Sequence, residues 1–322
     1  MKFLIIRTSV TFAEICVELK TLISERGLYV EEIHKSEYNK SYKKEFDIFI
    51  VVGMYAFNPG IDHKNKVFVG WHTEWYPEFY IGDRAMDLYC YRRFKKVVNG
   101  YDLILTPTRD QHEYLKSKGY PSLLITLGYT SSFDYQIEDN TEESYDILFY
   151  GKLKPRRIEL VNILSKYFKL YPKIENLYGV DEKRKAFSKS KVCLDLKSGE
   201  SLAFHWLRFS EILSNRKPII AEFSHDSFPY ICNTDYLLIH KDKMIKNIEE
   251  FLCNQALMNE MAINAYKRGQ KYSLEKNIDR LLTYIEHLHF NSRKRLYRVI
   301  RLINATKLVK LDYENAFPYL PF

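Results

Sequence analysis

The stretch that decides the fold is residues 145–157, which read Tyr-Asp-Ile-Leu-Phe-Tyr-Gly-Lys-Leu-Lys-Pro-Arg-Arg. The apolar run 146–150 is typical of a buried strand, and a glycine ends it. Pro155 favours the first turn of a helix, and Arg156 and Arg157 follow it directly. Four basic side chains thus gather where a helix also presents free N–H groups, which suits a diphosphate. The alternative is a solvated basic turn.

The same alternation of apolar strands and amphipathic helices continues on both sides of this stretch. It predicts an α/β fold with parallel sheets covered on both faces. We expect strands at 2–6, 47–52, 66–70, 103–106, 123–127, 146–150, 191–196, 218–221 and 236–240, and helices at 12–27, 84–98, 156–167, 207–214, 244–268 and 274–291. We therefore predict two Rossmann-like domains facing a cleft, where ligands bind at the carboxyl ends of strands.

The acidic segment before Tyr145 is the predicted linker between these domains. The expected ranges are 1–140 for an N-terminal domain and 141–290 for a C-terminal domain. A basic amphipathic extension, 291–322, follows.

The composition limits the classes of function. The chain has 322 residues, of which 46% are hydrophobic and 28% charged, and this mixture excludes a disordered chain. The formal net charge of +8 favours an anionic partner. The five cysteines lie far apart and lack the spacing of a zinc or redox site, and no apolar run approaches the ~20 residues of a membrane span. We expect a cytoplasmic protein, with peripheral contact at a membrane surface as an option.

A second cationic feature lies on the helix predicted at 207–214. Arg208 and Glu211 are three residues apart and share a helix face. Arg208 can reach a phosphate, while Glu211 can accept hydrogen bonds from a ribose diol. The alternative is an ordinary ion pair on a surface helix.

The order of these features resembles the nucleotide-binding half of GT-B glycosyltransferases, most closely the CgeB-like, spore-maturation type. Four motifs carry the resemblance: Tyr150-Gly151 running to Arg156-Arg157, Tyr178-Gly179, Ser190-Lys191 before a strand, and Arg208-x-x-Glu211 running into the strand at 218–221. The resemblance implies transfer of a sugar from a nucleotide diphosphate donor, with a UDP-sugar favoured and a GDP-sugar as the alternative. It also implies terminal helices that cross back to the first domain. The donor-binding residues that we expect are Gly151, Lys154, Arg156, Arg157, Tyr178, His205, Arg208 and Glu211.

The chain departs from this family pattern in two places. Ala203 stands where many retaining members carry a second glutamate, and the first loop, 8–11, lacks glycine. Sugar recognition and the choice between retention and inversion are therefore open.

The acceptor side is predicted just past the strand at 66–70, where the chain reads Trp-His-Thr-Glu-Trp-Tyr from residue 71. Aromatic rings suit stacking on a sugar or base, so Trp71, Trp75 and Tyr76 are expected to contact the acceptor. A carboxylate here can deprotonate an acceptor hydroxyl. Glu74 is the candidate base and His72 the second candidate. A similar Thr-Asp or Thr-Glu step occurs in the phage glucosyltransferase that acts on hydroxymethylcytosine in DNA. The alternative is that the tryptophans are packing residues and that Glu74 caps a helix.

The segment from Arg293 to Lys310 is basic, with apolar residues at helical spacing. It is expected to dock on the first domain, on anionic lipid or on nucleic acid. No metal ligand set is evident and no obligatory cofactor is expected, because cationic side chains and a helix terminus can stabilise a leaving diphosphate.

Three functions fit these observations. The first is a glycosyltransferase that acts on a hydroxyl acceptor such as a glycan or protein. The second is a glucosyltransferase that modifies a hydroxymethylated base in DNA. The third is an inactive GT-B scaffold that binds a nucleotide, glycan or nucleic acid. The oligomeric state is not indicated.

Overall fold

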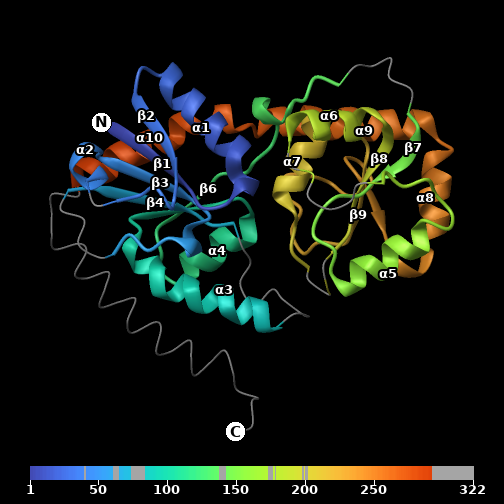
Figure 1. Ribbon diagram of the computed structural model, residues 1–322, viewed down its shortest axis with the longest axis horizontal. Helices are drawn as coiled ribbons and strands as arrows, with labels where there is room; N and C mark the ends of the chain where they lie inside the picture. The colour runs from blue at the N-terminus through green and yellow to red at the C-terminus, as the bar shows by residue number, and fades with distance from the viewer. Residues whose placement is uncertain are drawn as a thin grey trace, which may run out of the picture. The chain divides into compact units, whose positions relative to one another are not determined.

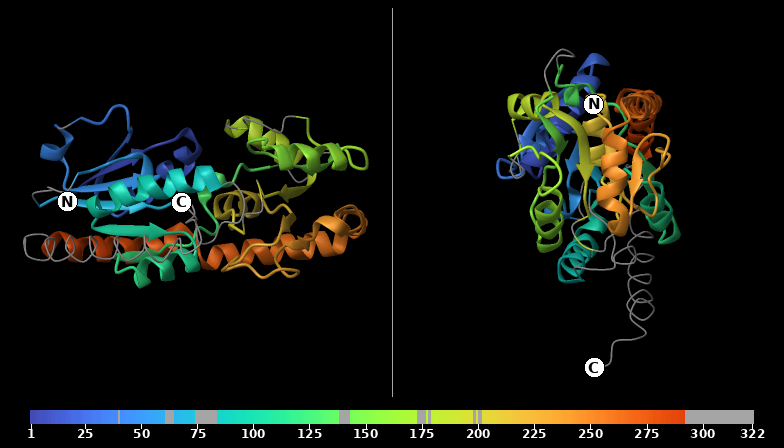
Figure 2. Two further views of the ribbon diagram at one scale, coloured as in Figure 1. Left: turned by 90° about the horizontal axis from the view of Figure 1, so that it is seen from below. Right: turned by 90° about the vertical axis from the view of Figure 1, so that its right-hand side faces the viewer.

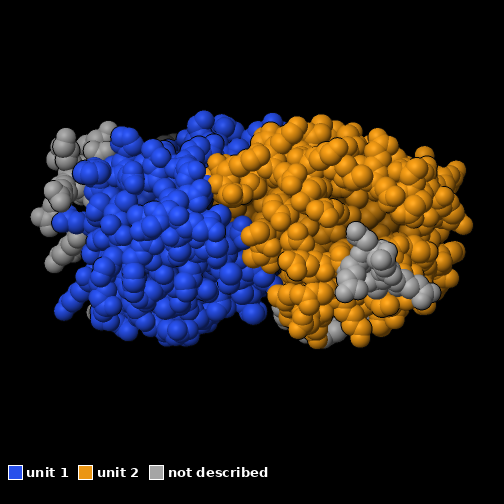
Figure 3. Space-filling model, turned by 90° about the horizontal axis from the view of Figure 1, so that it is seen from above, with its two compact units in different colours: residues 1–78, 85–125, 278–322 blue, residues 79–84, 126–277 orange. Residues whose placement is uncertain are grey.

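The computed structural model describes residues 1–39, 41–60, 65–73, 84–137, 143–172, 177, 179–197, 199 and 202–291. The chain divides into two compact units, with crossings between Ile125 and Thr126 and again between Asn277 and Ile278 (Figure 3). The first part of the chain forms unit 1, and the part between the two crossings forms unit 2. The predicted basic extension lies outside the described residues, apart from Asn291.

Unit 1 contains a parallel sheet of six strands in the order β2-β1-β3-β4-β5-β6. Figure 1 shows α1 and α10 on one side of this sheet and α3 and α4 on the other. The elements of this unit are β1 (Lys2–Arg7), α1 (Ala13–Glu25), β2 (Tyr29–His34), α2 (Tyr42–Glu45), β3 (Ile48–Val52), β4 (Val67–Trp71), α3 (Arg84–Val97), β5 (Leu103–Thr106), α4 (Arg109–Ser117) and β6 (Ser122–Leu124).

The sheet of unit 1 forms because its central strands are apolar throughout. All five residues of β3 are buried, as expected for a parallel strand covered on both faces. Helix α1 buries Ile15, Leu19 and Ile23 on one face, and Gly27 follows it at a φ of 71°, as its predicted C-cap position requires.

Unit 2 contains a second parallel sheet, in the order β10-β9-β8-β7. The elements between the two crossings are β7 (Tyr145–Leu148), α5 (Pro155–Leu164), α6 (Val180–Ser188), β8 (Ser190–Asp195), α7 (Trp206–Ser214), β9 (Ile219–Glu222), β10 (Leu237–Ile239), α8 (Met244–Leu252) and α9 (Gln255–Lys271), with α10 (Leu274–Asn291) leading out of it. One core cluster joins β7 and β8 to α5, α8 and the start of α9.

Helix α10 returns to the first half of the chain, as predicted, because Ile278 and the residues after it belong to unit 1. Figure 2 shows this long helix in orange and red. The Arg26 side chain at the end of α1 pairs with Asp279, and Arg280 donates to the main-chain oxygen of Leu124. No helix of the described chain is long and apolar enough to cross a membrane.

Some predicted elements differ from the observed ones. The single helix expected at 244–268 is two helices, because the chain turns at Cys253 and the side chain of Asn254 caps α9 through the N–H of Leu257 at 3.1 Å. Among the strands and α-helices of the described residues, four were not predicted: β2, α2, α4 and α6.

Candidate functional site

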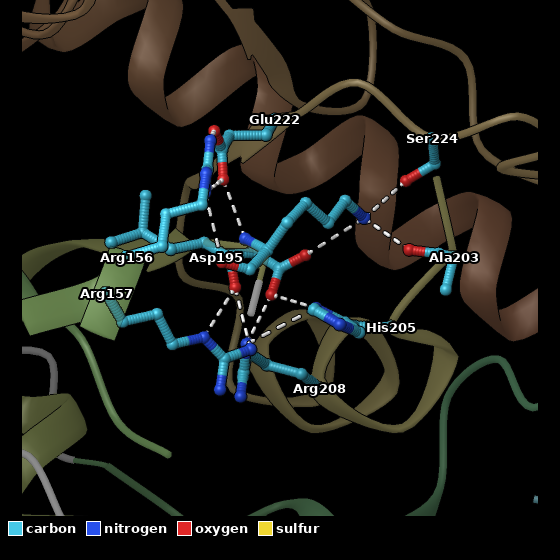
Figure 4. A network of polar contacts seen from close by, with 10 residues as sticks. Arg156, Arg157, Asp195, Ala203, His205, Arg208, Glu222 and Ser224 are labelled. Atoms are coloured by element: carbon cyan, nitrogen blue, oxygen red, sulfur yellow. Dashed lines mark hydrogen bonds and ion pairs between the residues drawn. The ribbon is translucent and has the colours of Figure 1, made fainter. Parts of the chain in front are cut away.

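The candidate site lies at the carboxyl edge of the sheet in unit 2. Gly151 follows β7, Asp195 ends β8, and Glu222 ends β9. Helices α5 and α7 begin after two of these strands, and neither has a side-chain cap. Figure 4 shows the converging side chains of three arginines, two carboxylates and one histidine: Arg156, Arg157, Arg208, Asp195, Glu222 and His205. Lys197 lies beside Asp195 and donates its main-chain N–H to Glu222. We call these seven residues the cationic cluster.

Asp195 organises one half of the cationic cluster. Its side chain is fully buried, and Oδ1 accepts hydrogen bonds from His205 Nδ1 at 2.6 Å and from Arg208 Nη1. Burial alone would raise the pKa of Asp195, but its contacts with His205 and with the charged Arg208 hold it well below its usual range. Asp195 is therefore an ionised carboxylate inside the protein.

Arg208 extends from α7 over the end of β7. Its guanidinium lies 5.3 Å from the ring centre of Tyr150 and 5.9 Å from that of Phe149. Its Nε is buried and makes no hydrogen bond within the described part of the chain. A buried N–H of a charged group without an acceptor is costly, so this atom is a donor available to a ligand.

Arg156 and Glu222 form the other half of the cationic cluster. The two guanidinium Nη atoms of Arg156 meet the two carboxylate oxygens of Glu222, and one of these contacts is 2.8 Å. Such two-point pairs fix geometry as well as charge. The main-chain N–H of Lys197 also donates to Glu222, at 2.6 Å.

Arg157 is buried and donates to main-chain oxygens. Its Nε and Nη2 donate to Leu196 O at 3.0 and 2.8 Å, and its Nη1 donates to Lys152 O at 3.0 Å. The side chain therefore joins the loop after β7 to the end of β8.

Lys197 is 3% exposed. Its Nζ donates to Ser224 Oγ at 2.7 Å and to Ala203 O, and it lies 3.9 Å from Asp195 Oδ2. Burial lowers the pKa of Lys197 to about 8, against the opposing charges of Asp195 and Glu222. At pH 7 the side chain is still mostly protonated.

The cationic cluster concentrates basic side chains at this edge of the sheet. Arg156, Arg157, Lys197 and Arg208 gather around the carboxylates Asp195 and Glu222. Helices α5 and α7 begin at the same edge. Basic side chains and helix N-termini both bind phosphate oxygens, so this arrangement suits a phosphate-bearing anion.

Glu211 is placed differently from the ribose contact that the sequence predicts. Its carboxylate accepts hydrogen bonds from Tyr135 at 2.5 Å and from Tyr150 at 2.7 Å, and Lys183 Nζ lies 2.7 Å away. The residue is 6% exposed. A ribose that contacts this carboxylate would replace one of these three partners or use the remaining acceptor site of Oε2.

The remaining predicted donor residues are distributed as follows. Gly151 contacts the cationic cluster, Lys154 precedes α5 and is partly exposed, and Tyr178 lies outside the described residues. Asp195, Lys197 and Glu222 were not predicted. The available signal was an ionisable residue at or just past the end of an otherwise apolar strand, which in a parallel sheet marks the ligand-binding edge.

On the acceptor side, Trp71 and His72 are part of the core of unit 1. Trp71 is fully buried, and His72 is 2% exposed with its ring edge-on to Phe94 at 5.2 Å. Burial lowers the pKa of His72 to about 3, so the ring is neutral. In this structure the Trp71 ring has no face open for stacking. Glu74, Trp75 and Tyr76 lie outside the described residues.

No family model matches the chain, and no curated protein matches it in sequence. Solved structures do match. The sucrose-phosphate synthase of Thermosynechococcus elongatus aligns over 89% of this chain and 100% of its own, with a TM-score of 0.62 and 11% identity. The chain has the GT-B fold.

Two other neighbours share this GT-B fold. Anabaena HepE in complex with UDP-glucose covers 88% of this chain and 100% of its own, with a TM-score of 0.59 and 12% identity. A UDP-N-acetylglucosamine 2-epimerase of Listeria monocytogenes, described as putative, covers 91% and 97%, with a TM-score of 0.58 and 14% identity. At such identities the likeness shows the fold, and the activity has to be argued from the site.

Proposed function

We propose that this GT-B protein is a glycosyltransferase that takes a sugar from a nucleotide diphosphate donor, with a UDP-sugar favoured over a GDP-sugar. The observation that carries the proposal is the gathering of four basic side chains where two helices begin, together with the buried Nε of Arg208, which has no hydrogen-bond partner among the described residues. A nucleoside diphosphate has the negative charge and the acceptor atoms that suit this arrangement. Structural neighbours named for UDP and UDP-glucose complexes support the choice of nucleotide.

In the proposed reaction the cationic cluster stabilises the leaving nucleoside diphosphate. Charge develops on the diphosphate as the bond to the sugar breaks, and fixed cations and helix N–H groups stabilise that charge without rearranging. Arg208 and Lys197 are the proposed direct contacts. Arg156 and Arg157 are also proposed contacts, and their present partners hold them in place around Gly151. Glu211 stays the proposed ribose contact.

The acceptor half of the proposal rests on sequence. Glu74 is the proposed base that removes the proton of the acceptor hydroxyl, so that its oxygen forms the new bond to the sugar. His72 is the second candidate, and its burial beside Phe94 makes it the weaker one. The same proposal includes acceptor contacts of Trp75 and Tyr76, the CgeB-like assignment and a metal-independent mechanism. DNA modification and an inactive scaffold are the alternatives to this proposal.

The first test is binding of UDP, GDP, TDP and CMP, measured by thermal shift and then by calorimetry. We expect UDP or GDP to raise the melting temperature and Arg208→Ala to weaken binding about ten- to a hundredfold, as for a lost hydrogen bond to a charged group. Arg216→Ala is the matched control, since Arg216 is exposed and lies over the ring of Tyr266. No stabilisation by any of the four nucleotides would refute the proposed function.

The second test concerns the proposed base. Once an acceptor is in hand, Glu74→Gln should abolish transfer while leaving nucleotide binding intact. Unchanged transfer by this variant would show that Glu74 is not the base.

A further inference from the structure

His205 is the one member of the cationic cluster that belongs neither to its four basic side chains nor to its two carboxylates. It precedes the first residue of α7, and its Nδ1 lies 2.6 Å from Asp195 Oδ1. About a quarter of its side chain, 24%, is exposed. Asp195 is ionised, so the proton between the two atoms belongs to Nδ1.

The other ring nitrogen, Nε2, makes no hydrogen bond to any residue that the structure describes. The state of this atom depends on whether the ring carries one proton or two. Arg208 Nη1 binds the same Asp195 oxygen and lies 3.5 Å from His205 Nδ1. Its positive charge therefore disfavours a second proton on the imidazole ring. Burial lowers the pKa of His205 to about 4, which exceeds the opposing effect of Asp195.

A neutral imidazole that donates through Nδ1 can only accept at Nε2. Phosphate oxygens are also acceptors, so they do not complement this atom. A hydroxyl group does, because it has a proton to donate. The donor that we propose carries such hydroxyls on its sugar, next to the diphosphate that the cationic cluster would bind.

We propose that His205 accepts a hydrogen bond through Nε2 from a hydroxyl of the sugar on the nucleotide-sugar donor. This inference rests on the proposed function and gives His205 a part in sugar selection rather than in binding the diphosphate. Asp195 is then a positioning residue, because it fixes the proton on Nδ1 and the orientation of the ring.

The test compares the affinity for UDP with the affinity for UDP-glucose, UDP-galactose and UDP-N-acetylglucosamine, by calorimetry at pH 7.5. The variants are His205→Phe, which keeps a ring but has no acceptor, and His205→Gln, whose amide oxygen can accept. For the UDP-sugar that wild type binds most tightly, we expect His205→Phe to reduce affinity about three- to tenfold, as for one neutral hydrogen bond. UDP affinity should stay within about twofold of wild type, and His205→Gln should recover part of the loss.

The other outcomes are distinct. Equal losses for UDP and UDP-sugar would assign His205 to the diphosphate, and no loss for either would leave it a purely structural residue; both results overturn the inference. Thermal unfolding of each variant identifies a folding defect. If His205→Phe does not fold, the comparison of UDP and UDP-sugar affinities in His205→Gln decides. Wild-type protein that binds none of these compounds would instead refute the proposed function itself.

Discussion

Gly151 and Arg208 lie in direct contact: a Cβ atom added to Gly151 would stand 2.6 Å from Arg208 Nη2. The backbone of Gly151 also has a φ of 132°, a conformation that side-chain-bearing residues rarely adopt. Both facts require glycine here, and together they place the loop after β7 against the guanidinium that we assign to the diphosphate.

Gly151→Ala is therefore expected to affect both the backbone and the position of Arg208. The strained φ should lower the free energy of unfolding by about 1–3 kcal/mol, and displacement of Arg208 should weaken UDP binding as well. Gly27→Ala is the control, because Gly27 has a φ of 71° with nothing within 4 Å of the added atom. The control should lose stability but keep UDP affinity. Equal UDP affinity for both variants would show that the contact with Arg208 does not matter for binding.

The lowered pKa of Lys197 predicts how UDP binding depends on pH. As pH rises through about 8, Lys197 loses its proton and the cationic cluster loses one positive charge. UDP affinity should therefore decrease between pH 7 and 9, and calorimetry across this range measures it. Lys197→Met should bind UDP more weakly at pH 7 and show a flatter pH profile.

Unfolding would not explain such a decrease. The unfolded chain keeps the ordinary Lys pKa of 10.5, so between about 8 and 10.5 it binds a proton that folded Lys197 does not. By linkage, the contribution of Lys197 to stability increases with pH in this window. A wild-type profile as flat as that of Lys197→Met would contradict the assignment.

Glu211 is expected to be as important for stability as for binding. Glu211→Ala removes an ion-pair partner of the buried Lys183, and removing one partner of a buried ion pair lowers the free energy of unfolding by about 3–5 kcal/mol. The double variant Lys183→Met/Glu211→Leu should lose less, because no charge stays buried. Urea denaturation compares the two, and a Glu211→Ala variant as stable as wild type would exclude the buried ion pair. UDP binding by the folded double variant then tests the ribose contact of Glu211, which predicts weaker binding than by the wild type.

Trp71 is expected to act on stability rather than on acceptor binding. Since the side chain is fully buried, Trp71→Ala should lower the free energy of unfolding by about 3–5 kcal/mol, and Trp71→Phe by less. Melting temperatures measure this effect. A Trp71→Ala protein with unchanged stability and impaired transfer would restore the acceptor role that the sequence predicts.

The fold was largely predictable because its central strands are apolar throughout. β3, β5 and β8 coincide with predicted strands to within a residue or two, and α10 matches its predicted bounds. β2 was missed because its sequence, Tyr-Val-Glu-Glu-Ile-His, is that of a half-exposed edge strand with two central glutamates. Helix α6 was missed because it is short and mostly charged, with few apolar residues to mark a buried face.

The site was predictable only in part, for a different reason. The arginines were predicted because basic residues at the start of a helix can be recognised from a short stretch of sequence. Their partners were not: Glu222 lies 66 residues after Arg156, and only the pairing of β8 with β9 brings the two together. The buried state of Glu211 likewise depends on Tyr135, from 76 residues earlier. Local spacing cannot reveal such contacts.

The return of α10 to unit 1 has a consequence for synthesis on the ribosome. Unit 1 lacks this helix, with its contacts to Arg26 and Leu124, until about 150 further residues have been translated, which at roughly 5–20 residues per second takes about 8–30 s. During that interval the apolar face that α10 will cover is exposed on the nascent chain. Chaperone binding to ribosome-bound chains that end before residue 278 would reveal this exposed apolar face.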